Sequence, residues 1–127
     1  MRSEGLFKIS ELHLCIATVS EANCSEPWRK KHARHKLQKA HIRHSSNRIP
    51  KELPIHIKIT RISPRTLDSH DNLPMSVKYI SDQLAAEITG NHVAGRADDD
   101  KRITWEYDQV KGKPQGVLIE FFRKNAT

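Results

Sequence analysis

Alternating isoleucines near the middle of the chain constrain its fold more than any other feature. Ile55, Ile57 and Ile59 occupy every second position, and the residues between them are polar. Side chains of a β-strand point to opposite faces in turn, so this pattern predicts a strand over residues 54–62 with one buried face. Weaker alternation predicts strands over residues 6–18, 103–110 and 117–122. A turn-rich segment separates the last two, and we expect them to form a β-hairpin.

A cationic helix is predicted between the first two strands. Ser25 and Pro27 are typical of a helix start, and the helical pattern runs over residues 26–43. Its apolar stripe is thin, since only Ala33, Leu37 and Ala40 recur on one side. We expect this narrow face to pack down and the remaining circumference to stay in solvent.

The second predicted helix begins at Asp71, which can cap it, and ends at Gly90. Its buried stripe consists of Leu73, Val77, Ile80, Leu84 and Ile88. The resulting order is strand, helix, strand, helix, strand, strand. This order predicts a single α+β domain over residues 1–127, with a small mixed sheet of about four strands and two main helices packed on it.

Charge is distributed unevenly along the 127 residues, whose net charge is +7. Residues 27–66 contain twelve Lys or Arg and one acid, whereas residues 67–108 contain nine acids and four Lys or Arg. A basic block of this kind indicates a nucleic acid or another anionic surface as partner, and the alternative is a basic face that only confers solubility. The candidate DNA-binding residues in the first helix are Arg29, Lys30, Lys31, Arg34, Lys36, Lys39 and Arg43.

Carboxylates gather in two places in this basic chain. Asp68 and Asp71 precede the second helix, and the run Asp98–Asp100 precedes the third strand. Carboxylates converging from separate segments can hold Mg²⁺ against a phosphate, and a nearby lysine such as Lys78 can offset negative charge in the transition state. On a continuous helix Lys78 and Asp82 would share an edge with Asp71. The alternative is that Asp71 is only a helix cap and that Lys78 and Asp82 form an ordinary surface pair.

These acidic motifs resemble the core of the RusA-type Holliday-junction resolvases, including phage-encoded members. The similar residues are Asp71-Asn72-Leu73, then Lys78 and Asp82, then an Asp-Asp pair before a strand. The resemblance implies a homodimeric α+β endodeoxyribonuclease that binds branched DNA in recombination and repair and cuts it with Mg²⁺, or with Mn²⁺ in its place. It implies the catalytic residues Asp71, Asp99, Asp68 and Lys78, and the metal ligands Asp68, Asp71, Asp99 and Asp100.

Two departures from the family pattern leave a second hypothesis open. Ser69 stands where the family has its first aspartate, and Met75 stands where its lysine often lies. A non-catalytic nucleic-acid-binding protein on the same scaffold is therefore the alternative. A weaker third hypothesis is a zinc module, because His32 with His35 and His41 with His44 have the i,i+3 spacing of helical metal ligands.

The cysteine content and the hydropathy pattern bear on the compartment. Two cysteines, Cys15 and Cys24, do not make a disulfide framework, and no apolar stretch approaches the length of a membrane span. The first residues include Glu4, Lys8 and Glu11, which interrupt any apolar signal region. We expect a cytoplasmic protein with reduced thiols.

Overall fold

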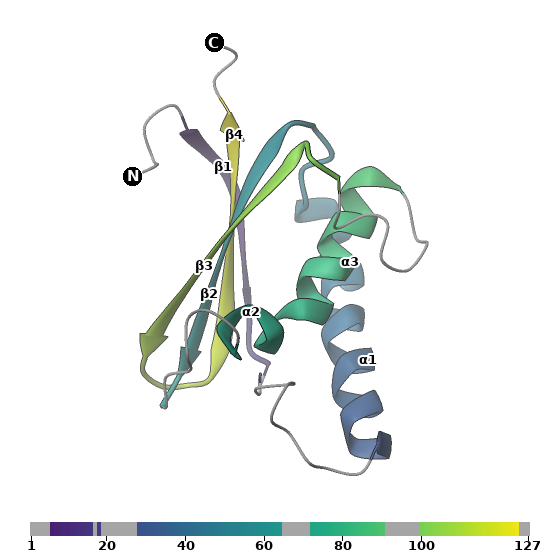
Figure 1. Ribbon diagram of the computed structural model, residues 1–127, viewed down its shortest axis with the longest axis vertical. Helices are drawn as coiled ribbons and strands as arrows, with labels where there is room; N and C mark the ends of the chain where they lie inside the picture. Colours follow the sequence, from purple (N-terminus) through teal and green to yellow (C-terminus); the bar gives the residue numbers. More distant parts are fainter. Residues whose placement is uncertain (1–5, 17, 19–27, 65–71, 91–99, 125–127) are drawn as a thin grey trace.

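The structure is a computed structural model that describes residues 6–16, 18, 28–64, 72–90 and 100–124 (Figure 1). In chain order its elements are β1 (Leu6–Leu14), α1 (Trp28–His44), a short 3-10 helix (Ser46–Arg48), β2 (Ile55–Ser63), α2 (Asn72–Ser76), α3 (Lys78–Thr89), β3 (Ile103–Lys111) and β4 (Gly116–Lys124). The predicted α+β class, with a four-stranded mixed sheet and two main helices, is confirmed. No helix in the described ranges is long and apolar enough to cross a membrane.

The strand order is β1-β4-β2-β3. β4 therefore lies between β1 and β2, and β2 separates it from β3. β4 runs antiparallel to both β1 and β2, and β3 runs parallel to β2. The predicted β3–β4 hairpin is therefore wrong. The chain from β3 to β4 passes around the end of β2, where the Gly112 amide donates to the Ser63 carbonyl at 2.9 Å. β2 takes the inner position because Ile55, Ile57 and Ile59 make most of its inward face apolar.

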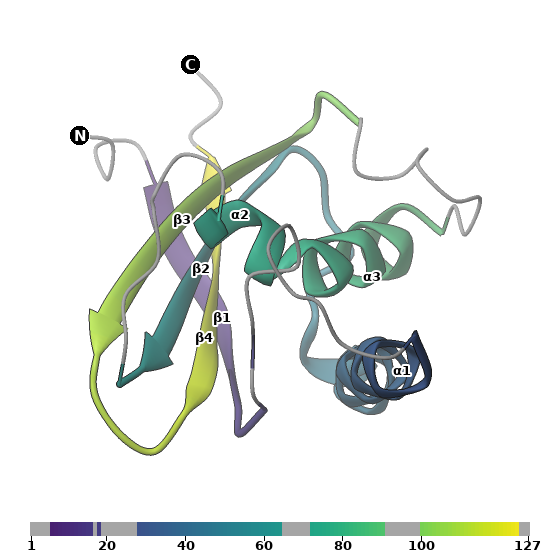
Figure 2. The same ribbon diagram turned by 60° about the horizontal axis from the view of Figure 1, so that its bottom comes forward.

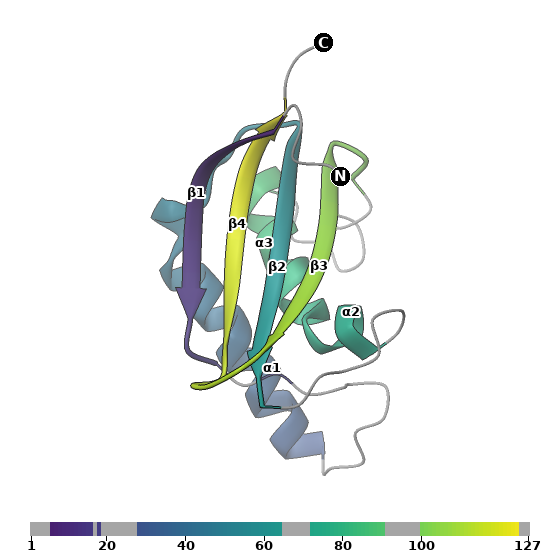
Figure 3. The same cartoon turned by 90° about the vertical axis from the view of Figure 1, so that its left-hand side faces the viewer.

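Both main helices lie on one face of the sheet (Figure 2). The core lies between them and the inward side chains of the strands, which include Ile57, Ile59, Ile119 and Phe121. Viewed from the other side, the sheet stands in front of the helices with its four strands in order (Figure 3). In the first strand Leu12 and Leu14 are buried as the alternation predicts, although β1 is shorter than expected and ends at Leu14.

The second predicted helix is divided into α2 and α3 at Val77. This residue has φ −118° and ψ 14°, outside the helical region, and it starts α3 without a side-chain cap. The Ser76 hydroxyl donates to the Leu73 carbonyl at 2.7 Å and so satisfies a carbonyl at the end of the short helix. The predicted stripe is still buried in full, because Val77 itself points into the core. α3 ends as predicted at Gly90, whose φ of 76° suits a residue without a Cβ.

α1 packs on α3 with a different face from the one predicted. Leu37 is 55 % exposed and Ala33 is exposed, whereas Gln38 and Ile42 are 1 % and 0 % exposed. Leu37 and Ile42 are five residues apart, which is about 140° around a helix, so no single orientation buries both. The β-branched Ile42 enters the core and the Ala33–Leu37 side faces outward. The predicted packing stripe of α1 is therefore wrong.

Candidate nucleic-acid interface

α1 presents its positive charge to solvent without acidic neighbours on the helix. Its 17 residues contain no Asp or Glu. Of the seven cationic residues predicted to bind DNA, Arg29, Lys30, Lys36 and Arg43 are exposed, and Lys31, Arg34 and Lys39 are partly buried. All seven belong to the helix that the sequence predicted, so one element holds the whole predicted set.

Five side chains of α1 form what we call the cationic stripe. Arg29, Lys36 and Arg43 recur every seven residues, which keeps them within about 40° of one another around the helix. His32 and Lys39 follow the first two of these by three residues and widen the stripe on one side. At about 1.5 Å per residue, the stripe extends about 21 Å along the helix. Its length equals several phosphate spacings of a nucleic-acid strand.

A pocket opens where the cationic stripe meets α3. It has a volume of about 370 Å³, and its lining residues are His32, His35, Lys36, Lys39 and Tyr79. The His35 and Tyr79 rings stack with centroids 3.6 Å apart and planes 21° apart. Lys39 Nζ lies 5.6 Å from the centre of the Tyr79 ring, within the range of a cation–π contact. The pocket therefore joins an aromatic wall to a cationic rim.

The face of the sheet opposite the helices has charges of both signs that pair with each other. Lys8 contacts Glu11 and Glu120, and these two carboxylates raise the pKa of Lys8. Lys58 lies 3.9 Å from Glu106. His56 Nε2 lies 2.9 Å from the same carboxylate. Because its cations already have acidic partners, this face attracts a polyanion less than α1 does.

The three predicted catalytic acids lie outside the described residues. These are Asp68, Asp71 and Asp99, and the neighbouring Asp98 lies outside them too. Asp100 is described, and its carboxylate accepts hydrogen bonds from Arg102 Nε at 3.0 Å and from a terminal guanidinium nitrogen at 2.7 Å. These bonds and the Arg102 backbone N–H lower the pKa of Asp100 to about 2. As a metal ligand, Asp100 would share its carboxylate with Arg102.

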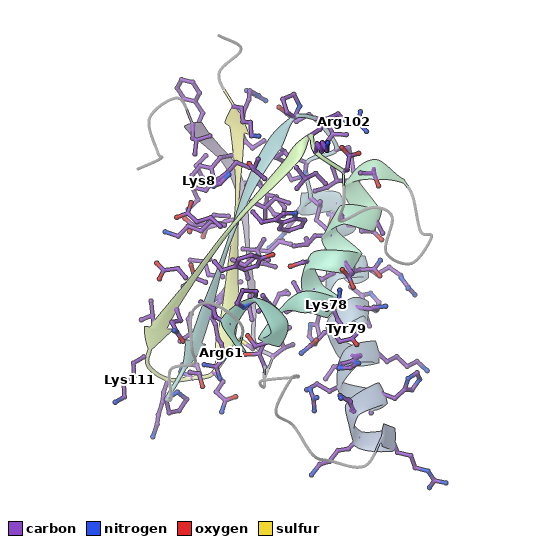
Figure 4. The ribbon with its side chains drawn as sticks, in the orientation of Figure 1. Lys8, Arg61, Lys78, Tyr79, Arg102 and Lys111 are labelled. Atoms are coloured by element: carbon purple, nitrogen blue, oxygen red, sulfur yellow. The ribbon has the colours of Figure 1, made fainter. Side chains whose placement is uncertain are left out.

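Lys78 is the first residue of α3, and Figure 4 shows Arg102 near the opposite end of that helix. Asp100 stays near Arg102, whose carbonyl accepts from the Ile55 amide at 2.9 Å at the start of β2. The structure therefore does not bring Lys78 and Asp100 together. Within the described ranges, no three His, Cys, Asp or Glu side chains are close enough to hold a metal ion.

Lys78 and Asp82 do share an edge of α3, with Lys78 Nζ 3.6 Å from an Asp82 carboxylate oxygen. This is the ordinary i,i+4 surface pair that was the alternative reading of the motif. The expected alignment with Asp71 relied on one continuous helix. The break at Val77 changes the angular relation between α2 and α3, so the helical projection across it no longer applies.

Arg61 is a buried cation that the sequence interpretation did not single out. Its side chain is 5 % exposed and lies at the end of β2 beside α2 (Figure 4). Its Nε donates to the Thr18 hydroxyl at 2.8 Å, and burial lowers the pKa of the guanidinium. A signal was present, since Arg61 continues the series Ile55, Ile57, Ile59 on the inward face. The series places a charge where the next core residue would be.

The histidine pairs of the zinc hypothesis show no metal geometry in the described structure. His35 is engaged in the stack with Tyr79, and no third ligand joins His32 or His35. No protein-family model matches the chain, and no curated protein matches it, so the assignment of a function rests on the residues and their arrangement.

Proposed function

We propose that this protein binds nucleic acid through α1. One observation carries the proposal: α1 packs through Gln38 and Ile42 and leaves an acid-free cationic stripe in solvent. Lys and Arg along such a stripe neutralise backbone phosphates and release condensed counterions, which gives affinity without reading the base sequence. On the opposite face of the sheet, acids and bases pair with each other and attract a polyanion less, which also favours binding at α1.

We propose further that the ligand is branched DNA and that the protein cuts it as a metal-dependent endodeoxyribonuclease, in the manner of Holliday-junction resolvases. The acidic motif and its order along the chain support this activity. A bound Mg²⁺ would polarise the scissile phosphate and activate water. The described carboxylates do not form such a site, because Asp100 is paired with Arg102 away from Lys78. The proposed ligands are therefore Asp68, Asp71 and Asp99, with Asp71 as the principal one.

A homodimer would suit paired cuts across a four-way junction, since two-fold symmetry places two identical sites on one ligand. We also propose a cytoplasmic location, where Cys15 and Cys24 stay reduced. A size measurement of the purified chain with and without junction DNA tests the first of these.

Binding is tested with a labelled four-way junction, a linear duplex and a single strand over a series of salt concentrations. Changing Arg29, Lys30 and Lys36 together to Gln should weaken binding to all three and flatten the salt dependence. The slope of log K against log salt should fall by about 2 to 3, since each phosphate contact contributes about 0.9 on duplex DNA. The matched control changes Lys101, Lys111 and Lys113 to Gln, three exposed lysines around β3. Equal losses in both triple variants would contradict an α1 interface.

Cleavage is tested on the same junction with Mg²⁺, Mn²⁺ or EDTA. The wild-type chain should nick it with either metal and not with EDTA. Asp71→Asn should abolish nicking and leave the dissociation constant within about threefold, because the change removes one charge outside α1. Full cleavage by Asp71→Asn would contradict the assignment.

The second candidate is a non-catalytic nucleic-acid-binding protein on the same scaffold. The ion pair between Asp100 and Arg102 and the distance of Asp100 from Lys78 favour it. Under this alternative, junction binding would depend on α1 as above, and no nicking would occur with either metal. The two assays together separate the candidates.

A further inference from the structure

We infer that the pocket between α1 and α3 seats one nucleotide, with its phosphate between Lys36 and Lys39. This inference rests on the proposed function, since it names a subsite within the α1 interface. The charge of the lining carries the first step: His32, Lys36 and Lys39 are contributed by two successive turns of α1, and no lining residue is acidic. A phosphate placed there meets two ammonium groups and no carboxylate.

The position of these three side chains on the helix carries the second step. His32, Lys36 and Lys39 are spaced four and three residues apart, so they lie on one side of α1 within about 60° of each other. Lys39 Nζ is already held over the Tyr79 ring, which reduces the freedom that binding would remove. Lys36 is exposed and can swing toward the same anion.

The size and the walls of the pocket select a nucleotide rather than a free phosphate ion. A volume of about 370 Å³ is within the range of small-molecule sites and far exceeds what one phosphate group fills. The stacked His35 and Tyr79 rings and the aliphatic stems of the lysines offer an apolar surface for a sugar and base edge. A nucleotide combines such a surface with an anion, as the pocket does.

The location of the pocket explains how it would serve the larger interface. It lies midway along the cationic stripe, between Arg29 and Arg43 at the two ends. A strand that follows the stripe therefore passes over the pocket, and one of its nucleotides can enter. Asp82 is the carboxylate of α3 nearest in sequence to Tyr79 of the pocket. It is paired with Lys78 at 3.6 Å, which reduces its repulsion of a phosphate in the pocket.

The test is a titration of the full chain with thymidine 5′-monophosphate at low salt, followed by NMR of the backbone amides. The amides of Lys36, Lys39 and Tyr79 should shift and saturate. Thymidine, which lacks the phosphate, and inorganic phosphate, which lacks the sugar and base, should each bind at least tenfold more weakly. Inorganic phosphate as tight as the nucleotide would overturn the nucleotide assignment.

Two double variants locate the binding. Lys36→Gln with Lys39→Gln should raise the dissociation constant for thymidine 5′-monophosphate at least tenfold. The matched control, Lys111→Gln with Lys113→Gln, removes the same charge from two exposed lysines outside α1 and should change it less than threefold. Equal effects would overturn the pocket in favour of general attraction to a basic protein. Tyr79→Phe, which keeps the ring, should bind like wild type, and Tyr79→Leu should lose at least fivefold while its amide spectrum stays that of a folded chain.

Failure of this inference and failure of the proposed function give different results. If the α1 triple variant loses DNA binding but the nucleotide does not shift the pocket amides, only the pocket assignment fails. If the nucleotide binds in the pocket but no DNA substrate binds the chain, the pocket stands and the nucleic-acid function fails.

Discussion

At the scale of single residues, two arginines each hold one carboxylate by paired hydrogen bonds. Arg102 holds Asp100, and Arg123 holds Glu52 at 2.7 and 2.9 Å. Both pairs are in contact with solvent, so each contributes little net stability. Their clearest consequence is on protonation, because an adjacent guanidinium favours the ionised carboxylate. The pKa of both acids is accordingly lowered.

These two pairs make a prediction with built-in controls. Arg102→Gln should raise the pKa of Asp100 from about 2 toward its ordinary value of 3.8 and leave Glu52 unchanged. Arg123→Gln should raise the pKa of Glu52 and leave Asp100 unchanged. NMR titration of the side-chain carboxyl carbons measures both. A carboxyl whose pKa is depressed on folding stabilises the fold above its unfolded pKa, so this contribution should disappear between about pH 4 and pH 2. A shift of both acids in either variant would contradict the pairing.

At the scale of elements, the orientation of α1 decides which of its residues meet solvent. A helix this rich in Lys and Arg buries little, so its position depends on the few side chains that enter the core. Ile42 and Gln38 enter it, and Leu37 does not. The cationic stripe is exposed as a consequence of this choice. The same rotation places Lys36 and Lys39 beside Tyr79 of α3.

Truncating the two large aliphatic residues of α1, Leu37 and Ile42, tests this orientation. Ile42→Ala should lower the free energy of unfolding by about 2–4 kcal/mol, because it leaves a cavity in the core. Leu37→Ala should lower it by less than about 0.5 kcal/mol, since an exposed side chain loses few contacts. Urea denaturation of both variants measures the difference. A larger loss for Leu37→Ala than for Ile42→Ala would mean that α1 packs with the opposite face.

At the scale of the whole molecule, the sheet has two different faces and a defined centre. The helices cover one face (Figure 3), and the other carries the paired charges of Lys8, Lys58 and their carboxylates. β2 and β4 each pair with two strands, whereas β1 and β3 each pair with one in the described sheet. β2 and β3 are parallel because the chain crosses over through α2 and α3 between them. This crossover returns the chain to the end of the sheet at which β2 begins.

Hydrogen exchange of the backbone amides tests this topology. The amides of β2 and β4 should exchange most slowly, because their groups bond to neighbours on both sides. Alternate amides of β1 and β3, which point away from the sheet, should exchange much faster. A hairpin of β3 with β4 would instead leave β2 at an edge. Fast exchange along half of β2, with uniform protection of β3, would contradict the observed order.

Local patterns predicted the elements well because each pattern reports on the residues that carry it. Ile55, Ile57 and Ile59 are all buried, the stripe from Leu73 to Ile88 is buried, and Gly90 ends α3. The face that α1 buries was wrong for a long-range reason. The choice between Leu37 and Ile42 depends on what α3 offers, and the local pattern of α1 does not contain that information. The same holds for the candidate interface. The cationic helix was predicted from its local pattern, but the pocket that it forms with Tyr79 of α3 was not, because the pocket depends on how the two helices pack.

By itself the sequence determined the α+β class, the places of the strands and helices, and the concentration of positive charge on one helix. These depend on side-chain periodicity and composition, which act within an element. Only the tertiary structure decided that β2 separates β3 from β4, that α1 turns Ile42 inward, and that Asp100 pairs with Arg102 far from Lys78. Those features depend on which surfaces bury each other, and burial is a property of pairs of elements distant in sequence.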